Sequence, residues 1–451
     1  MSDSPRHPSA LPGRRPLPWY LLPHWPWLAL AALLFAYVAL GVSEFSAELA
    51  SWHAAAGREQ QLDGNPQRAL SHLDNAVACN ADNPEFYRWR AECYRALNQY
   101  ERALEEYDHL AQIRPLKTWG HFQRADLLML LGRRQQAVAA AREGFDAFRR
   151  TGASTGGLGS AQVLNGVAYF RAVAQLELDD ALPQITEALQ LLGGQSRIFT
   201  DYAYLCFLQG EYPLALKLLS AAEQSYADLQ QLQVTALESE QSPVDQDDIR
   251  SRIRDLQKNR GRVLYYRLLV LRKQVSQLQD GLAAVSPDNA VSPDNASERK
   301  QLAQQLADKQ ALVGTAEERF ENELDSSVEE WEERTLPAKH ELVEMMRLYA
   351  MVIDTRGFLY YQREEYAAAF QDVRLAVQIG EAVASEWLSI QRGKETDLRE
   401  LERERRSFCR SLATIRYHRL LVASRLKASS MAEEDRRRIE ELGYQPTPEL
   451  F

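Results

Sequence analysis

Two sets of residues recur every 34 positions in the N-terminal part of the chain. One set contains residues that tolerate a left-handed turn and the other contains alanines: Gly64, Asn98 and Gly132 in the first, and Ala69, Ala103 and Ala137 in the second. A period of this length corresponds to one helix–turn–helix unit. Because a single pair of helices cannot bury its apolar face, neighbouring units must stack. The period therefore predicts an all-α solenoid.

The most complete unit spans residues 84–117. Its first helix carries an aromatic, a small and another aromatic residue, and a turn, a second helix and a closing proline follow: Tyr87, Ala91, Tyr94, Asn98, Tyr100, Ala103, Tyr107 and Pro115. Small residues let two helices approach closely where they cross, and the rings fill the gaps beside them. The pattern resembles the tetratricopeptide repeat family, in its membrane-anchored bacterial form, and the resemblance implies a TPR-like α-solenoid.

Weaker copies of the unit continue along the chain, at 50–83, 118–151, 164–189, 196–229 and 350–383. The turn of the 164–189 copy has no clear position in the sequence. The tail from Leu412 to Gly443 reads as a degenerate final pair. These copies divide the chain into repeats at 44–151 and 161–229, and a repeat with a degenerate C-terminal cap at 341–451.

A charge-free stretch near the N-terminus predicts a transmembrane helix at residues 19–42. From Trp25 to Val42 the sequence is almost continuously apolar, close to the ~20 residues that a bilayer core requires. The competing interpretation is a cleaved signal peptide, which has a shorter apolar region and a small-residue cleavage site. We therefore expect an uncleaved helix in the lipid bilayer.

Flanking charges predict the orientation of this helix. Arg6, Arg14 and Arg15 precede it, whereas Glu44 and Glu48 come directly after it. By the positive-inside rule, the Pro-rich tail at 1–18 stays in the cytoplasm and the repeat domain lies outside it, at the cell membrane. The alternative is the same scaffold facing the cytoplasm.

Between residues 230 and 340 the repeat pattern gives way to another periodicity. Apolar residues alternate by four and three, as in a heptad seam: Leu264, Leu268, Leu271, Val275, Leu278 and Leu282. A less regular stripe follows at Leu302, Leu306, Val313, Ala316, Phe320, Leu324, Val328 and Trp331. The hexapeptide VSPDNA separates them, twice in succession at 285–296, and its prolines stop helices.

This segment predicts an antiparallel coiled-coil hairpin inserted between repeats. Its seam must be covered, and two arrangements remain open. The hairpin is either a lever for partner binding or homo-oligomerisation, or two long helices that lie on their neighbours in the array.

Composition and cysteine spacing bear on the possible partners and cofactors. A formal net charge of −10 argues against nucleic acid, because neutralising phosphates requires an excess of Lys and Arg. The four cysteines show no paired spacing, so neither a zinc site nor a disulfide framework is predicted, and a Cys79–Cys93 bridge stays open. We expect no cofactor and no metal.

Two short motifs resemble catalytic signatures. Residues 152–156 (GASTG) match G-x-S-x-G, which works on a strand-to-helix elbow in an α/β sheet. Here the motif follows a helical repeat within a Gly-rich run, so we expect a linker, and a hydrolase using Ser154 is the alternative. Residues 340–344 (HELVE) begin like a zincin helix, but Glu344 stands where the second His should be.

The resemblance to tetratricopeptide repeat proteins implies that a partner lies in the concave groove lined by the first helices. Carried over to this chain, the groove residues are Arg88, Glu92, Arg95, Trp119, Phe122 and Asp126. The Lys/Asn set with which some relatives bind a chaperone's C-terminal carboxylate is absent from the matching positions. A mixed aromatic and charged groove suits a peptide or helix, and is also what a solvent-exposed repeat surface looks like. We expect a non-enzymatic scaffold for other proteins.

Overall fold

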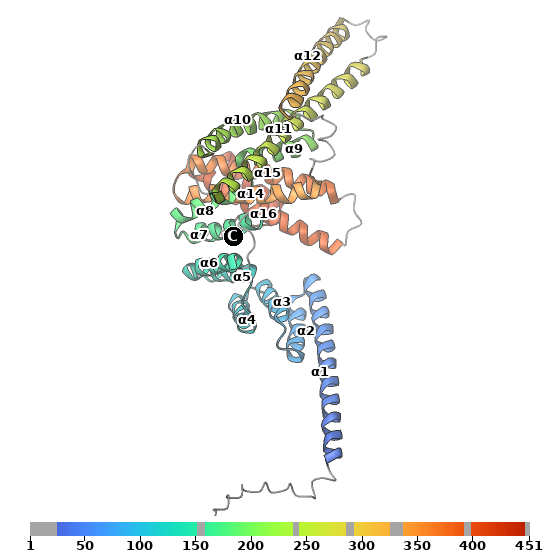
Figure 1. The fold of residues 1–451 in the computed structure, drawn as a ribbon, viewed down its shortest axis with the longest axis vertical. Helices are drawn as coiled ribbons and strands as arrows, with labels where there is room; N and C mark the ends of the chain where they lie inside the picture. The colour runs from blue at the N-terminus through green and yellow to red at the C-terminus, as the bar shows by residue number, and fades with distance from the viewer. Residues whose placement is uncertain are drawn as a thin grey trace, which may run out of the picture. The chain divides into compact units, whose positions relative to one another are not determined.

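The computed structural model describes residues 25–150, 158–237, 243–285, 293–324, 337–391 and 398–446, without the side chains of 25–26, 36–44, 225–237, 243–252, 293–295 and 398–400. Its residues divide into two compact units, Met1–Pro115 (unit 1) and Leu116–Phe451 (unit 2). Throughout the described ranges the secondary structure is α-helical (Figure 1). The expected all-α fold is confirmed.

Unit 1 consists of the first repeats. Its helices are α1 (Trp25–Leu62), α2 (Pro66–Cys79), α3 (Pro84–Ala96) and α4 (Tyr100–Ile113). The start of α3 illustrates the local causes: Pro84 occupies the first turn, and the Asn83 side chain accepts a hydrogen bond from the Glu85 backbone N–H at 3.0 Å. This cap satisfies one of the N–H groups that a helix leaves open at its start.

The turns fall where the 34-residue period predicts them. Gly64, Asn98 and Gly132 have φ of 78°, 58° and 72°. At Asn98 the chain closes α3 with backbone bonds from Asn98 N–H to the Arg95 carbonyl at 3.0 Å and from Gln99 N–H to the Tyr94 carbonyl at 2.8 Å. This left-handed ending satisfies carbonyls that the helix leaves open. The period thus reports the local geometry correctly.

The alanines of the period lie where helices cross. Ala69, Ala103 and Ala137 are all fully buried. A larger side chain at these positions would hold the paired helices apart, because interiors pack without spare volume. The predicted packing role of the small residues is confirmed.

Unit 2 holds the remaining helices. They are α5 (Thr118–Leu130), α6 (Arg134–Arg150), α7 (Leu158–Ala174), α8 (Leu178–Leu191), α9 (Gly194–Leu208), α10 (Tyr212–Leu237), α11 (Pro243–Ala284), α12 (Pro293–Leu324), α14 (Lys339–Gln362), α15 (Tyr366–Gln391), α16 (Leu398–Arg425) and α17 (Ser429–Glu441). The turn that the sequence left undefined, between α7 and α8, lies at Gln175 and Glu177, where φ is 57° and 53°. The α14–α15 turn uses Glu364 with φ of 65°.

After the long insertion, the chain returns to the earlier repeats of unit 2. Helix α14 packs against α7, α8 and α9 as well as against α15. The Tyr349 hydroxyl donates to the Leu192 carbonyl at 2.7 Å, and the Gln209 side chain donates to the Ala382 carbonyl at 2.7 Å. Repeats that are separated by the insertion in sequence therefore share one core.

The insertion forms two long antiparallel helices, α11 and α12, which extend side by side in Figure 1. Two ion pairs show that the helices are antiparallel: Arg260–Glu323 at 2.6 Å and Arg272–Glu317 at 2.7 Å. From the first pair to the second, the residue number rises on α11 and falls on α12. The hairpin starts later than predicted, because the residues from 230 to Leu237 extend α10, the partner of α9.

Only part of the predicted seam lies between the two hairpin helices. Leu264, Leu268 and Leu271 are buried in the part of α11 that also packs against α9 and α10. Leu278 and Leu282 are half-buried and lie in the part of α11 beyond that core. At the base of the hairpin, the long helix α11 therefore lies on neighbouring helices of the array, which is one of the two arrangements that the sequence left open.

Several predicted features lie outside the described residues: the tail 1–18, residues 19–24 of the predicted span, the motif at 152–156, most of the doubled hexapeptide, and Val328 and Trp331. From Trp25 onward, the predicted span belongs to the 38-residue helix α1. Within the part of the chain that the structure describes, no helix combines the length and the apolar character needed to cross a membrane.

Candidate functional site

The six predicted groove residues do not form one described site. Arg88, Glu92 and Arg95 belong to α3 of unit 1, whereas the other three belong to α5 of unit 2. In unit 1, Arg88 donates to Glu85 at 2.6 Å and to Glu92 at 3.0 Å, and Glu92 also accepts from Arg58 at 3.1 Å. These side chains already form an ion-pair network on the helix surface. Their groove role stays a prediction.

The three residues of α5 have different environments. Trp119 is half exposed, but Phe122 is only 5% exposed and stacks on Phe170 of α7 with ring centroids 6.1 Å apart. The Phe122 ring fills the space beside Gly166, where an added Cβ would lie 3.1 Å from it. Phe122 is thus a core residue, because its ring seals the α5–α7 contact. Asp126, the third, lines a cavity.

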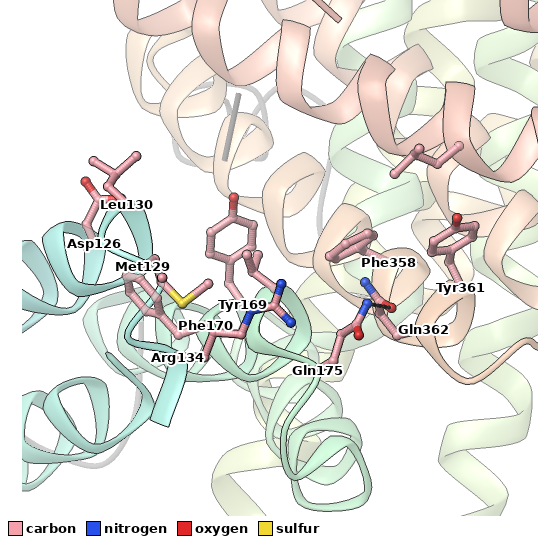
Figure 2. Close-up of a pocket in the computed structure, with 13 residues that line it drawn as sticks. Asp126, Met129, Leu130, Arg134, Tyr169, Phe170, Gln175, Phe358, Tyr361 and Gln362 are labelled. Atoms are coloured by element: carbon pink, nitrogen blue, oxygen red, sulfur yellow. Dashed lines mark hydrogen bonds between the residues drawn. The ribbon is translucent and has the colours of Figure 1, made fainter. Parts of the chain in front are cut away.

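This cavity of unit 2 has a volume of about 380 Å³. Its walls come from α5, α6, α7, α14 and α16, so they combine the early and late parts of the unit (Figure 2). The lining residues are Asp126, Met129, Leu130, Gly132, Arg134, Tyr169, Phe170, Val173, Gln175, Phe358, Tyr361, Gln362 and Leu421. We take it as the candidate functional site.

Aromatic rings form two sides of the cavity. Figure 2 shows Tyr169 and Phe170 of α7 on one side and Phe358 and Tyr361 of α14 on the other. The rings of Phe358 and Tyr361 stack with centroids 5.9 Å apart. At the edge, Gln175 donates to Gln362 at 3.1 Å and ties the end of α7 to the end of α14. The rings are therefore held by their own helices before any partner arrives.

A buried polar pair supports the α14 wall. The His418 ring of α16 stacks on Phe358 with centroids 4.1 Å apart, and its Nδ1 lies 2.7 Å from Asp354 Oδ2. Both side chains are buried, and Asp354 Oδ1 has no hydrogen-bond partner within the described structure. Since one His nitrogen is bonded to the carboxylate, the imidazole orientation is fixed and Phe358 is held in place.

Tyr169 supplies a hydrogen-bond donor to the cavity. Burial, and then the charges of Asp354 and Asp126, raise the pKa of its phenol above the ordinary value. Negative charges disfavour a phenolate, so the hydroxyl stays protonated at neutral pH. The residue is therefore suited to donating a hydrogen bond and not to acting as a nucleophile.

The structure shows two further features of the residues considered for chemistry. All four cysteines are free thiols, so the Cys79–Cys93 bridge that the sequence left open is not formed. In the described ranges, no three His, Cys, Asp or Glu side chains gather closely enough to hold a metal ion. His340, Glu341 and Glu344 lie exposed on the first turns of α14, as expected for a solvated helix face.

Sequence reasoning missed most of the cavity residues. Tyr169 lies in the 164–189 copy and Phe358 in the 350–383 copy, but the spacing gives no means of bringing these two copies together. A usable signal was present: Phe358, Tyr360 and Tyr361 place three aromatic residues within four positions of the first helix of the 350–383 copy, and the repeat pattern requires only two aromatics on a first helix. Surplus aromatics on a first helix indicate a second packing surface.

Residues 62–119 match the family model described as tetratricopeptide repeat. A comparison with curated proteins finds no match.

Several solved structures resemble the chain at low identity. YrrB, described as a TPR protein with an unusual peptide-binding site, is 14% identical over 38% of this chain and 82% of its own, with a TM-score of 0.27. MamA from Desulfovibrio magneticus RS-1 is 14% identical over 39% and 93%, with a TM-score of 0.28. PilF of Pseudomonas aeruginosa is 12% identical over 64% and 98%, with a TM-score of 0.28.

The family match covers α2 to α4, where the 34-residue period is most complete. It agrees with the left-handed turns and buried alanines described above. Residues 62–119 of this chain are therefore similar to the tetratricopeptide repeat family.

Proposed function

We propose that this chain is a membrane-anchored helical-repeat scaffold that binds a partner protein through the cavity of unit 2. The cavity is the observation that carries the proposal. A volume of about 380 Å³ accommodates one or two large side chains. Aromatic residues that are already held in position bind a partner side chain at low entropic cost, which is why they dominate interaction hot spots.

The chemistry of the lining supports binding without catalysis. Its polar groups are the amides Gln175 and Gln362, the charged side chains Asp126 and Arg134, the hydroxyl of Tyr361 and the protonated phenol of Tyr169. Catalysis by a nucleophile needs such a group beside a general base. The lining instead offers apolar area with a few polar groups, which is the composition of a recognition site.

Exposed apolar residues on α1 support the membrane anchor. Six of its side chains are 56–76% exposed: Trp27, Leu28, Leu30, Leu33, Leu34 and Phe35. At 100° per residue these positions surround the helix and do not form a single stripe. A helix that is apolar all round suits lipid better than a groove on one protein partner. We extend the proposal to the predicted orientation, with the repeats outside the cytoplasm.

The outer part of the α11–α12 hairpin supports a coiled-coil arrangement. Leu278 and Leu282 of α11 and Leu302 and Leu306 of α12 are half-buried, while the residues directly before and after them, apart from Gly281, are exposed. This pattern is typical of a seam between two helices. We include the hairpin in the scaffold, as a rigid arm on which a partner or a second copy can pack.

Site-specific photo-crosslinking in cells tests the binding proposal. A photoreactive amino acid at Met129 or Tyr361 should crosslink a partner protein, and one at Gln123 should not. Gln123 is the matched control because it is exposed on α5, six positions before Met129. Filling the cavity with Val173→Trp should abolish the crosslink from Met129 while circular dichroism stays unchanged. Equal crosslinking from Gln123 and Met129 would refute the cavity as the binding site.

A topology experiment tests the anchor. Alkaline phosphatase fused to the C-terminus should be active in a bacterial host, and deleting residues 1–42 should release the protein from the membrane fraction. Fluorescence of a cytoplasmic reporter fused at the same position would reverse the orientation. Retention of the shortened chain in washed membranes would show that α1 is not the anchor.

A further inference from the structure

We infer that the cavity of unit 2 selects an apolar side chain that lies next to a carboxylate in the partner. Arg134 is the residue that binds this carboxylate. This inference rests on the proposed function, because it names the chemistry of the side chain that enters the cavity. It is carried by the charge distribution at the cavity and not by its volume alone.

The two charged residues of the lining are not equivalent. Asp126 already interacts with another group of the chain. Arg134 is exposed, and its guanidinium makes no ion pair or hydrogen bond with any residue that the structure describes. Figure 2 shows the Arg134 side chain extending into the cavity region between the α7 and α14 walls. The positive charge is therefore the one left for a ligand.

The position of Arg134 in its helix strengthens this assignment. Arg134 is the first residue of α6, whose first turn contains no acidic residue. The N-terminus of a helix carries partial positive charge, so a basic side chain there is locally unfavourable and an anion is favoured. Because local stability does not explain an arginine at this position, a bound carboxylate is the natural counterpart. The carboxylate would accept a charged hydrogen bond from Arg134 and would interact favourably with the dipole of α6.

A basic ligand is disfavoured, because the carboxylate of Asp354 does not face the cavity. Asp354 is buried, does not line the cavity, and accepts from His418 at 2.7 Å. Its Oδ2 is occupied by the imidazole behind the wall. A lysine or arginine entering the cavity would meet Arg134 without gaining a free carboxylate. Like charges at close range cost affinity, so the site discriminates by repulsion as well as attraction.

The aromatic walls define the other half of the ligand. Between them, Tyr169, Phe170, Phe358 and Tyr361 present ring faces and edges, and Met129 adds a flexible thioether at one side. Such a surface binds an aromatic or long aliphatic side chain through area burial and ring contacts. The Tyr169 hydroxyl remains available as a donor to a carbonyl. The chemical class is thus an acidic peptide segment with one large apolar residue.

Two short fluorescent peptides test the inference on the full-length chain in detergent. Each carries one tryptophan, flanked by aspartates in one peptide and by lysines in the other, and the dissociation constant is measured by anisotropy at low salt. We expect the acidic peptide to bind about tenfold more tightly, the effect of one charged hydrogen bond. Arg134→Gln should remove this difference, and Arg133→Gln, which does not line the cavity, should preserve it.

Met129→Ala completes the design, because it should weaken both peptides by a similar factor without changing their ratio. Equal binding of the two peptides by the unaltered chain overturns the charge inference and leaves an apolar binding cavity standing. An unchanged ratio in Arg134→Gln overturns the role of Arg134. Failure of both peptides to bind overturns the inference, and it also removes the proposed function if no crosslink forms from Met129.

Discussion

Unit 1 packs its helices through small separate clusters, whereas unit 2 gathers helices from α7 to α16 around one core. In unit 1, one cluster contains Ala50, Ala54, Ala76 and Phe86, and the next contains Ala69, Leu73 and Cys93. In unit 2, the fully buried side chains include Tyr265, Tyr266, Tyr349, Phe320 and Met346. A regular repeat packs small residues on sequence neighbours, while the insertion requires larger side chains to fill the space between distant helices.

Ion pairs in both units range from exposed to buried, and in unit 1 the side chains of the Arg90–Glu106 pair are only 16% and 7% exposed. The Arg88 network of unit 1 lies at the surface, with Arg88 and Glu92 about one third to two fifths exposed. In unit 2, Asp435 is fully buried and accepts from Arg416 at 2.7 Å and from Arg419 at 2.7 Å. A surface pair contributes little to stability, but a buried charge without its partner is costly. We therefore expect substitution of Asp435 to have a larger effect than substitution within the Arg88 network.

The largest effect is expected for Asp435→Ala, which leaves two buried guanidinium groups without this carboxylate. Removing one partner of a buried ion pair typically costs about 3–5 kcal/mol of the free energy of unfolding. Urea denaturation measures the change. Glu433→Ala is the control, because Glu433 forms only an exposed pair with Arg436 at 3.6 Å. A loss for Asp435→Ala as small as that of the control would contradict the burial argument.

A pair of glycine substitutions compares the helix crossings of the two units. At Gly357 an added Cβ would lie 3.0 Å from Asp372 Cβ and 3.1 Å from the Val373 backbone N, which cannot rotate away. At Gly57 the closest neighbour is Leu73 Cγ at 2.9 Å, in a side chain that can shift, and the Ala69 backbone oxygen lies farther away at 3.3 Å. Gly357→Ala should destabilise the protein by about 1–3 kcal/mol.

Thermal unfolding of Gly57→Ala beside Gly357→Ala gives the comparison. The Gly57 variant should lose clearly less, because a leucine side chain relaxes more easily than a backbone. If the Gly57 variant lost as much stability as the Gly357 variant, the crossing in unit 1 would be as rigid as the one in unit 2.

Two Tyr→Phe substitutions compare hydrogen bonds of the same kind. Tyr349 donates to the Leu192 carbonyl at 2.7 Å inside unit 2, and Tyr87 donates to the Ala81 carbonyl at 2.9 Å at an exposed site of unit 1. Tyr349→Phe should cost about 1 kcal/mol, because it leaves a buried carbonyl without its donor. Tyr87→Phe should stay within about 0.5 kcal/mol, since water replaces the donor. Equal losses in denaturant titrations would remove the distinction.

The smallest effect is expected at Glu402, the exposed counterpart of Asp435. Hydrogen bonds from Arg405 and Arg406 lower the pKa of its carboxyl from 4.5 to about 2. Any stabilisation is therefore present above about pH 4.5 and is lost as the pH falls toward 2. Because Glu402 pairs with arginines at the surface and its side chain is 40% exposed, Glu402→Gln should leave the unfolding midpoint at pH 7 unchanged. A clear loss of stability at pH 7, reversed by high salt, would show that surface charges contribute more here than burial predicts.

Local structure was the part most accessible to sequence reasoning. The period located Gly64, Asn98 and Gly132 at left-handed turns and Ala69, Ala103 and Ala137 at crossings. These outcomes depend on φ and on the volume of one side chain, both of which are properties of single residues. Of the α12 stripe, Phe320 lies beside Tyr265 of α11, with ring centroids 6.3 Å apart.

The candidate site was much less accessible. Asp126 was named for a groove between neighbouring repeats, but it lines a cavity whose far wall is α14. Phe122 was placed in the groove, yet Gly166 opens a space that buries its ring. Neither result follows from repeat spacing, because the spacing describes adjacent units and the cavity joins units on either side of the hairpin.

The residues alone therefore establish that the chain forms stacked helix pairs, where those pairs turn, and which small side chains let them approach. The tertiary structure decides that α14 returns to α7, that Phe358 and Tyr361 face Tyr169 and Phe170, and that Arg134 remains without a partner among the described residues. The physical reason is range. Turn and crossing geometry depends on contacts within one repeat, whereas the cavity depends on contacts between helices that are distant in sequence.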